Sequence, residues 1–307
     1  MGLYGRHVQR DGCDMNDQDW LAERFEQHRT RLRAVSYRML GSLNEADDAV
    51  QEAWLRLSSA DTSQVNDLGA WLTTVVARIC LNVLRSRAAR REELVDPHLP
   101  DPIVSSADTL DPEDDALTAD SVGLALLIVL DTLAPAERLA FVLHDVFDVP
   151  FEQIAPIIDR SEPAARQLAS RARRRLSTTA TPDANLTAQW GPVDAFLVAA
   201  RDGDFDALLT VLDPDVVRRL DAGTTGADVP RILRGAQAVA SGALGFARLG
   251  YVARRALVNG APGVVAFADE EPFAVLGFTV AHGKIVEMNV LADPVRVRRL
   301  NLTVLAR

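Results

Sequence analysis

Apolar residues recur at helical spacing along the first half of the chain, and this pattern predicts a mostly helical N-terminal part. Asn44 is suited to cap a helix whose apolar positions form one stripe and whose other face is acidic. Asp67 is suited to cap the next amphipathic helix, which runs into an arginine cluster at 85–91. With a further helix that starts near Trp20, these segments predict a first all-α domain over residues 17–92.

The second helical unit, residues 117–178, follows a segment with a different texture. Residues 93–116 are rich in proline, aspartate and serine and show no apolar period, which is typical of a linker. Within the second unit, residues 149–176 combine a short apolar helix, a tight turn and an arginine-rich helix. Asp159 stands in the turn, where the residue must tolerate a left-handed backbone. This arrangement predicts a helix-turn-helix.

The third unit, residues 189–307, begins with helical patterns and continues with strand-like runs. The predicted helices cover 190–201, 205–212 and 231–249, and the predicted strands cover 251–258, 263–267, 273–280 and 284–291. Asn259-Gly260 and His282-Gly283 are turn signals between strands. Helices followed by an antiparallel sheet indicate an α+β fold. The whole chain is therefore predicted to be multidomain, with two all-α domains before an α+β domain.

The chain is acidic overall, with a formal net charge of −10, which argues weakly against nucleic-acid binding. The distribution of charge decides otherwise, because six arginines and one acid lie between Arg160 and Leu176. Paired hydrogen bonds from arginine to guanine give about 1–3 kcal/mol of discrimination. The alternative is an arginine-rich face that only contacts solvent. The candidate DNA-binding residues of this helix are Glu162, Arg166, Ser170, Arg171, Arg173 and Arg174.

A second basic surface follows the apolar stripe behind Asp67, where no acid interrupts the arginines. Its candidate DNA-binding residues are Arg78, Asn82, Arg85 and Arg87. Taken alone, such a cluster is equally well explained as a solvated helix end that the helix dipole favours. The helix that precedes it is nevertheless polar on one side, which makes a second DNA-facing surface a reasonable hypothesis.

An acidic face on the helix behind Asn44 has two interpretations. Its residues Asp47, Asp48, Gln51 and Glu52 either contact solvent or form a docking face for a basic partner protein. Metal binding is a poor third option, because nothing holds these carboxylates in a closed cage. No other pattern indicates a metal or a cofactor.

Bulk composition limits the remaining classes of protein. An apolar content of 48% supports packed cores, and two cysteines give neither a disulfide framework nor a metal pattern. We infer a reducing compartment, the cytoplasm. The longest apolar run, Val122 to Leu130, is too short to cross a membrane.

The helical units together resemble the extracytoplasmic-function sigma factors of RNA polymerase. NEADDAVQEAWLRL and GAWLTTVVARICLNVLRSRAARRE resemble the helices that bind core polymerase and read the minus-ten element, and LAPAERLAFVLHDVFDVPFEQIAPIIDRSEPAARQLASRARRRL resembles the domain that reads the minus-thirty-five element. The resemblance implies two partners, core RNA polymerase and promoter DNA. It places the acidic face on the polymerase clamp, Arg78, Asn82 and Arg85 near the melted minus-ten strand, and the arginine-rich helix on the upstream element.

Residues 189–307 resemble the SnoaL-like, NTF2-type domain that a subgroup of these factors, the SigJ type, carries. The resemblance rests on WGPVDAFLVAARDGDFDALLTVLDPDVV and on altered forms of three signatures: HLPDP in the linker, the loop from Asp221 to Gly226, and Asp293-Pro294-Val295-Arg296-Val297. In that subgroup the added domain is thought to regulate rather than to catalyse. The candidate regulatory residues are Asp221, Gly223, Asp293, Pro294 and Arg296.

Two alternatives stay open at this point. The chain could be a stand-alone helix-turn-helix regulator with a ligand-sensing tail, which would need no polymerase-binding face. It could also be an NTF2-type enzyme fused to a helical module, because such cones enclose an apolar pocket that could hold an unknown small ligand. Candidate acids and bases are Asp221, Tyr251, Asp269 and His282, but no pair has a spacing that indicates acid–base chemistry.

Overall fold

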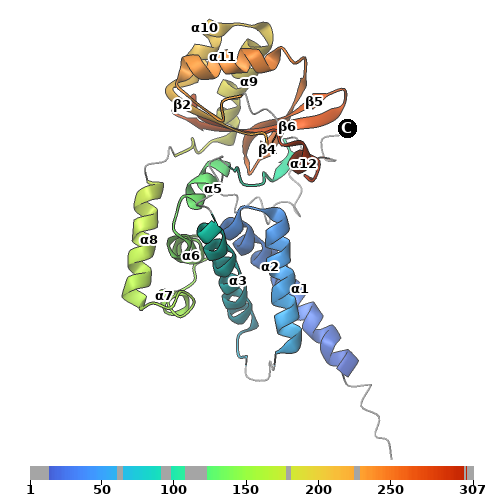
Figure 1. Cartoon of the computed structure of the whole chain (residues 1–307), viewed down its shortest axis with the longest axis vertical. Helices are drawn as coiled ribbons and strands as arrows, with labels where there is room; N and C mark the ends of the chain where they lie inside the picture. The colour runs from blue at the N-terminus through green and yellow to red at the C-terminus, as the bar shows by residue number, and fades with distance from the viewer. Residues whose placement is uncertain are drawn as a thin grey trace, which may run out of the picture.

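The structure is a computed structural model that describes residues 14–60, 65–90, 98–107, 123–177, 181–224, 229–300 and 302. Three helices form the first unit: α1 (Asp14–Leu40), α2 (Leu43–Ser59) and α3 (Leu68–Arg90). The stripe of α2 is buried as predicted, with Ala46, Ala53 and Leu57 inaccessible to solvent. The three helices pack on one another around this stripe (Figure 1).

The two predicted helix caps of this unit have different outcomes. The Asp67 carboxylate accepts the amide of Ala70 at 2.9 Å, which confirms the cap of α3. The prediction for Asn44 is wrong, because α2 begins at Leu43 and Ser42 occupies the N-cap position. The helix starts earlier because its first amide, that of Leu43, is bound by a carboxylate from a distant segment, Asp101.

Helix α3 has the length and apolar composition of a membrane span over Leu68–Ala89. Its apolar side, however, includes Leu72, Val76 and Cys80, which are fully buried among the other helices. Its opposite side carries exposed Arg78 and Arg85. We therefore interpret α3 as a core helix of the first unit.

The second unit contains the predicted helix-turn-helix. Its helical segments are α5 (Leu124–Asp131), α6 (Pro135–Phe141), a π-helical turn η2 (Val142–Val146), α7 (Phe151–Ile154) and α8 (Glu162–Leu176). Asp159, in the turn between α7 and α8, has a φ of 56°, as its position required. Small residues on the inner side of α8, including Ala165 and Ala169, are completely buried and let α8 pack closely on α6.

The first two units share one hydrophobic core. Arg138 of α6 is almost completely buried, and its guanidinium donates to the carbonyl oxygen of Arg38 in α1 at 3.1 and 3.2 Å. The same guanidinium bonds the carboxylate of Asp131 at 3.1 Å. Arg31 of α1 also donates to the carbonyl of Phe147, at 2.8 Å. The helix-turn-helix is therefore fixed against α1 by polar contacts as well as by apolar packing.

The third unit is a curved seven-stranded sheet with helices on one face (Figure 1). On this face lie α9 (Leu186–Asp202), α10 (Phe205–Val211) and α11 (Ala236–Ala247), whereas the short α12 (Pro294–Val297) lies on the other side, where Val297 joins the core of the helical units. Its strands are β1 (Val104–Ser106), β2 (Leu212–Asp221), β3 (Ile232–Arg234), β4 (Val252–Val258), β5 (Ala261–Ala268), β6 (Glu271–Ala281) and β7 (Lys284–Leu291), in the order β1-β4-β5-β6-β7-β2-β3. The result is the predicted NTF2-type cone, and the helical units lie against its other face.

The sheet differs from the prediction in two respects. Strands β4 to β7 form the predicted antiparallel meander, but β2 pairs with β7 in parallel, so the sheet is mixed. The helix predicted over 231–249 begins only at Ala236, because Ile232–Arg234 forms β3. Strand β2 escaped prediction because its sequence contains Asp213, Pro214 and two arginines and shows no clean alternation.

Part of the predicted linker belongs to this sheet. Residues Val104–Ser106 form β1, which pairs antiparallel with β4 so that Val104 lies opposite Val258. The described part of the linker, 98–107, is thus bound to the cone by backbone hydrogen bonds. A strand of three residues is too short to give a periodic signal, which explains why its sequence resembles an unstructured segment.

Candidate functional site

The outer face of α8 carries the residues predicted to bind DNA. Arg166, Ser170, Arg171, Arg173 and Arg174 are all exposed, and Glu162 is half-buried. Two arginines bind neighbouring acids: Arg166 pairs with Glu162, and Arg173 pairs with Asp145 at 2.6 Å. The side chains of Arg171 and Arg174 make no ion pair or hydrogen bond with any described residue. Among the predicted DNA-binding arginines of α8, these two have the fewest polar contacts within the described chain.

The predicted second basic surface lies on α3, where Arg78, Asn82 and Arg85 are exposed. The Arg78 guanidinium donates to the carbonyl oxygen of Pro156 at 3.5 Å, so this surface touches the turn of the helix-turn-helix. Arg87 has a different role: it is half-buried, donates to the carbonyl oxygen of Leu40 at 2.9 Å and pairs with Glu45. These contacts hold the bend between α1 and α2, which favours a structural role for Arg87.

The acidic face of α2 is accessible. Asp47, Asp48 and Gln51 are exposed, and Glu52 is half-buried beside Arg56, 2.9 Å away. Asp47 is neutralised by Arg33, whose Nε lies 2.6 Å from its carboxylate. Sequence reasoning missed Leu55, which leaves 54% of its surface exposed one turn beyond Gln51. The sequence could have indicated Leu55, because it is a large apolar residue that lies outside the buried stripe of α2.

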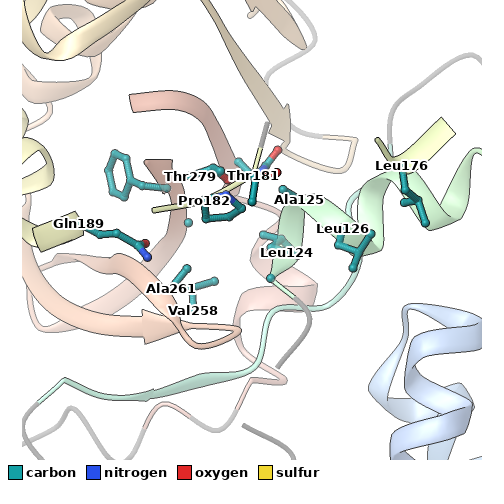
Figure 2. A pocket seen from close by; sticks show the side chains of 14 residues that line it. Leu124, Ala125, Leu126, Leu176, Thr181, Pro182, Gln189, Val258, Ala261 and Thr279 are labelled. Atoms are coloured by element: carbon teal, nitrogen blue, oxygen red, sulfur yellow. The ribbon is translucent and has the colours of Figure 1, made fainter. Parts of the chain in front are cut away.

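A cavity of about 360 Å³ opens where the cone meets the second helical unit (Figure 2). Leu124 and Leu126 of α5 and Leu176 of α8 contribute to its wall on the helical side. Val258 of β4 and Phe278 of β6 contribute on the cone side. Neither side forms this cavity alone, because both units supply its lining.

Arg296 stands at a second contact between the cone and the other units. The Asp293 carboxylate caps α12 by accepting the amides of Val295 at 2.8 Å and Arg296 at 3.4 Å. Pro294 occupies the first turn of that helix, where its missing amide hydrogen costs nothing. Gly223 lies against the cap, and a Cβ there would come within 2.6 Å of the Asp293 carboxylate. These residues together fix the start of α12 and hence the position of Arg296.

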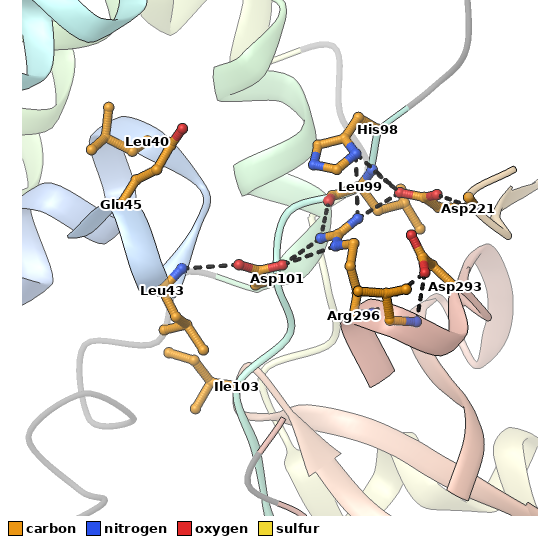
Figure 3. A network of polar contacts seen from close by, with 12 residues as sticks. Leu40, Leu43, Glu45, His98, Leu99, Asp101, Ile103, Asp221, Asp293 and Arg296 are labelled. Carbon is orange, nitrogen blue, oxygen red and sulfur yellow. Dashed lines mark hydrogen bonds and ion pairs between the residues drawn. The ribbon is translucent and has the colours of Figure 1, made fainter. Parts of the chain in front are cut away.

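The Arg296 guanidinium joins two carboxylates from distant segments (Figure 3). It bonds Asp221 of β2 at 2.6 Å and Asp101 of the linker at 2.5 Å, and we call these three residues the Arg296 cluster. It also donates to the carbonyl oxygen of Leu99 at 2.6 Å. The side chains of Arg296 and Asp221 are 12% and 7% exposed, so water screens their interaction only weakly.

The Arg296 cluster continues into the first helical unit. The second oxygen of Asp101 accepts the amide of Leu43 at 3.0 Å, at the start of α2. The Tyr37 hydroxyl donates to the carbonyl oxygen of Asp101 at 2.5 Å and accepts from the Asn259 amide at 2.9 Å. Burial raises the pKa of Tyr37, so the hydroxyl keeps its proton and remains a donor. Three segments of the chain therefore meet at one hydrogen-bonded centre.

His98 lies at the edge of this centre and is not one of the charged groups that hold it together. Its Nδ1 lies 3.4 Å from the Asp221 carboxylate, and the Arg296 guanidinium is equally close. Although 70% of the His98 side chain is exposed, partial desolvation, followed by the positive charge of Arg296, lowers the pKa of His98 below its ordinary value. The imidazole is therefore neutral near pH 7, and the cluster holds one cation between two carboxylates.

All five residues predicted to be regulatory lie within this centre or beside it. The sequence analysis assigns no site role to Tyr37 or Asn259, and it includes Asp101 only as part of HLPDP. Asn259 was interpreted as a turn residue, which fits its φ of 50°, yet its side chain is buried and bonds the amide of Ile103 at 3.1 Å. No local pattern marks Tyr37, because its partners are more than 60 residues away.

Other reactive groups are few in the part of the chain that the structure describes. That part contains no group of three or more histidine, cysteine or acidic residues arranged to hold a metal ion. Burial raises the pKa of the Cys80 thiol to about 12, so this cysteine is an inert core residue. The surfaces of α2, α3 and α8 and the two interdomain contacts remain as candidate functional sites.

Comparison with known proteins identifies the class. Sigma-70 region 2 matches residues 24–90 and Sigma-70 region 4 matches residues 124–176, so the two helical units are those of an RNA polymerase sigma factor. The ECF RNA polymerase sigma factor SigJ of Mycobacterium tuberculosis (strain ATCC 25618 / H37Rv) is 38% identical over 288 residues, which cover 88% of this chain and 91% of SigJ. The chain therefore belongs to the extracytoplasmic-function (ECF) sigma factors, as its sequence predicted.

The similarity extends through the cone. The crystal structure of Mycobacterium tuberculosis SigJ superposes with a TM-score of 0.74 at 34% identity, covering 92% of this chain and 99% of that chain. The probable ECF sigma factor SigI of Mycobacterium tuberculosis (strain CDC 1551 / Oshkosh) is 37% identical over 290 residues, 91% of this chain and 96% of SigI. The chain is thus a sigma factor that directs RNA polymerase to promoters, and its cone is shared with relatives.

Proposed function

We propose that the cone regulates this sigma factor by holding the linker and the two helical units in the arrangement described above. The observation that carries the proposal is the Arg296 cluster, in which one arginine of the cone binds a linker carboxylate that also caps α2. Promoter binding needs the surfaces on α3 and α8 to reach separate DNA elements. The Arg78 contact with the turn of the helix-turn-helix supports a rearrangement of the units before both surfaces can bind.

The test is run-off transcription with purified core polymerase on a matched promoter. We expect Arg296→Ala to change the yield of transcript at least threefold, and truncation after Leu176 to change it as well. Arg298→Ala is the matched control, because Arg298 is exposed at the end of α12 and its side chain makes no ion pair or hydrogen bond with the described residues. Yields equal to wild type for Arg296→Ala and for the truncated protein would remove the regulatory proposal.

For the polymerase and promoter contacts, we infer that the acidic face of α2 docks on core polymerase and that α3 and α8 read DNA. Charge reversal at Asp48 and Glu52 should abolish co-purification with core polymerase, whereas reversal at Asp206 on α10 should not. We expect weak promoter binding by the free protein, because its net charge of −10 opposes the basic surfaces. Tight binding of promoter DNA without polymerase would favour a stand-alone regulator.

We also infer that the cone is not catalytic and that the protein acts in the cytoplasm, where core polymerase is found. Among the candidate acids and bases, Asp221 is neutralised by Arg296, and Asp269 and His282 occupy hairpin turns with positive φ. These placements support structural roles. A small ligand fits the regulatory proposal, because the cavity lies where the cone contacts α5. Turnover of a small ketone substrate by the purified full chain would overturn the non-catalytic assignment.

A further inference from the structure

The cavity between the cone and α5 contains two buried amide side chains. Gln189 of α9 is 7% exposed and Asn289 of β7 is 1% exposed, and both line the cavity. The Oε1 atom of Gln189 and the Oδ1 atom of Asn289 have no hydrogen-bond partner among the described residues. A buried carbonyl oxygen without a donor is costly, so each of these atoms indicates a place for a donor from outside the chain.

The orientation of both amides is fixed by their other ends. The Nε2 atom of Gln189 donates to the carbonyl oxygen of Asp183 at 2.5 Å. The Nδ2 atom of Asn289 donates to the carboxylate of Glu287 at 2.8 Å. Rotation of either amide by half a turn would bring two acceptors together and leave an NH₂ group without an acceptor. The oxygens, and not the NH₂ groups, are therefore the free atoms.

The rest of the wall sets the chemistry of an occupant. The lining is mainly aliphatic and aromatic, with Leu124, Val258 and Phe278 among its members, and it includes no charged side chain. A volume of about 360 Å³ lies in the range of small-molecule sites. A charged ligand would lose its hydration without gaining a counter-ion. A neutral, mostly apolar molecule with two hydroxyl or N–H donors satisfies both oxygens.

We propose that this cavity binds an uncharged, largely apolar small molecule that donates hydrogen bonds to Gln189 and Asn289. Because Leu124 and Leu126 belong to α5, such a molecule contacts the DNA-reading unit and the cone at once (Figure 2). Binding then strengthens the contact between these units. Any effect on transcription rests on the proposed regulatory function of the cone, whereas binding to the free protein does not.

A series of three probes tests the site by calorimetric titration of the full chain. Naphthalene, 2-naphthol and 2,7-dihydroxynaphthalene have the same apolar body and none, one and two donors. We expect each added hydroxyl to tighten binding about fivefold, the factor typical of one net hydrogen bond. Equal affinities for the three probes, or no binding at concentrations up to about 1 mM, would overturn the proposal.

Two variants separate the cavity from unspecific binding. Gln189→Leu should retain the affinity for naphthalene and lower the affinity for 2,7-dihydroxynaphthalene about fivefold. Gln237→Leu, at an exposed position of α11, should change neither affinity. Ala261→Phe should lower the affinity for all three probes, because Ala261 lines the cavity and a larger side chain there would fill part of it. Thermal melting confirms that each variant is folded. An unchanged preference in Gln189→Leu, or unchanged binding in Ala261→Phe, would place the probes elsewhere and contradict the proposal.

Discussion

The arginines of the interdomain contacts and those on the outer face of α8 belong to the same residue type but have opposite surroundings. Arg296 is 12% exposed and binds two carboxylates and a carbonyl oxygen from two other segments. Arg171 and Arg174 are exposed, and their side chains make no ion pair or hydrogen bond with the described residues. The first kind joins parts of the chain, and the second kind is available for a partner.

This difference shows that partners, and not composition, decide what an arginine does. A guanidinium that is already bound on all sides has little to offer to DNA, because its donors are used internally. An exposed guanidinium with free donors can reach phosphate or guanine. Arg87, which was predicted with the DNA-binding residues, resembles Arg296 in this respect, since Leu40 and Glu45 occupy its donors.

The largest effect should come from the most buried arginine. Replacing Arg138 by alanine leaves the carbonyl oxygen of Arg38 and the carboxylate of Asp131 without this donor. We expect the free energy of unfolding of the helical units to fall by about 3 kcal/mol. Urea denaturation followed by circular dichroism measures this, with Arg171→Ala as an exposed control. A loss of less than about 1 kcal/mol would mean that Arg138 is not a structural centre.

Arg296→Ala should have the next largest effect on stability. It removes charge-assisted bonds to Asp101 and Asp221, and we expect a loss of about 2 kcal/mol. Arg296→Lys should restore less than half of this, because one ammonium cannot bridge both carboxylates with the geometry of a guanidinium. Thermal melting of the full chain compares the two variants. Full rescue by lysine would show that charge alone matters at this position.

The exposed arginines should behave in the opposite way. Arg171→Ala and Arg174→Ala should each reduce transcript from a matched promoter about tenfold, the loss that one good base contact gives. Their melting temperatures should equal that of wild type, because both side chains are exposed and neither makes an ion pair or hydrogen bond with the described residues. Run-off transcription tests the expected loss of transcript, and thermal melting tests the expected unchanged stability. Unchanged transcription in both variants would argue that another face of α8 reads DNA.

The smallest effect concerns Asp183, which joins the start of the cone to the β6–β7 hairpin. Its carboxylate accepts the amides of Gly283 and His282, and these bonds lower its pKa in the folded protein. A lowered pKa stabilises the fold above the unfolded value, about 3.9, and this contribution disappears as the pH falls through the folded value. The difference in melting temperature between wild type and Asp183→Asn should therefore be larger at pH 7 than at pH 3. A difference independent of pH would show that the charge is irrelevant.

Local patterns predicted much of this molecule. In α8 the alanines and the arginines recur at helical spacing on opposite sides of the helix, so the sequence predicts this helix. The segments of strands β4 to β7 are separated by turn signals, so the sequence predicts this meander as well. Strand β1 was not, because its partner lies about 150 residues away and its own sequence is too short to have a period. Asp101 and Arg296 are 195 residues apart, and only the fold brings them together. The resemblance to known sigma factors draws attention to the motifs that contain Asp101 and Arg296, but it does not predict the hydrogen bond between Asp101 and the amide of Leu43.

Amide hydrogen exchange in wild type and Arg296→Ala tests most directly whether Arg296 holds the linker between the cone and α2. We expect the amides of residues 98–106 and of Leu43 to exchange at least tenfold faster in the variant, because strand β1 and the start of α2 lose their common support. Arg298→Ala should leave these rates unchanged. Equal protection of these amides in wild type and Arg296→Ala would contradict the account.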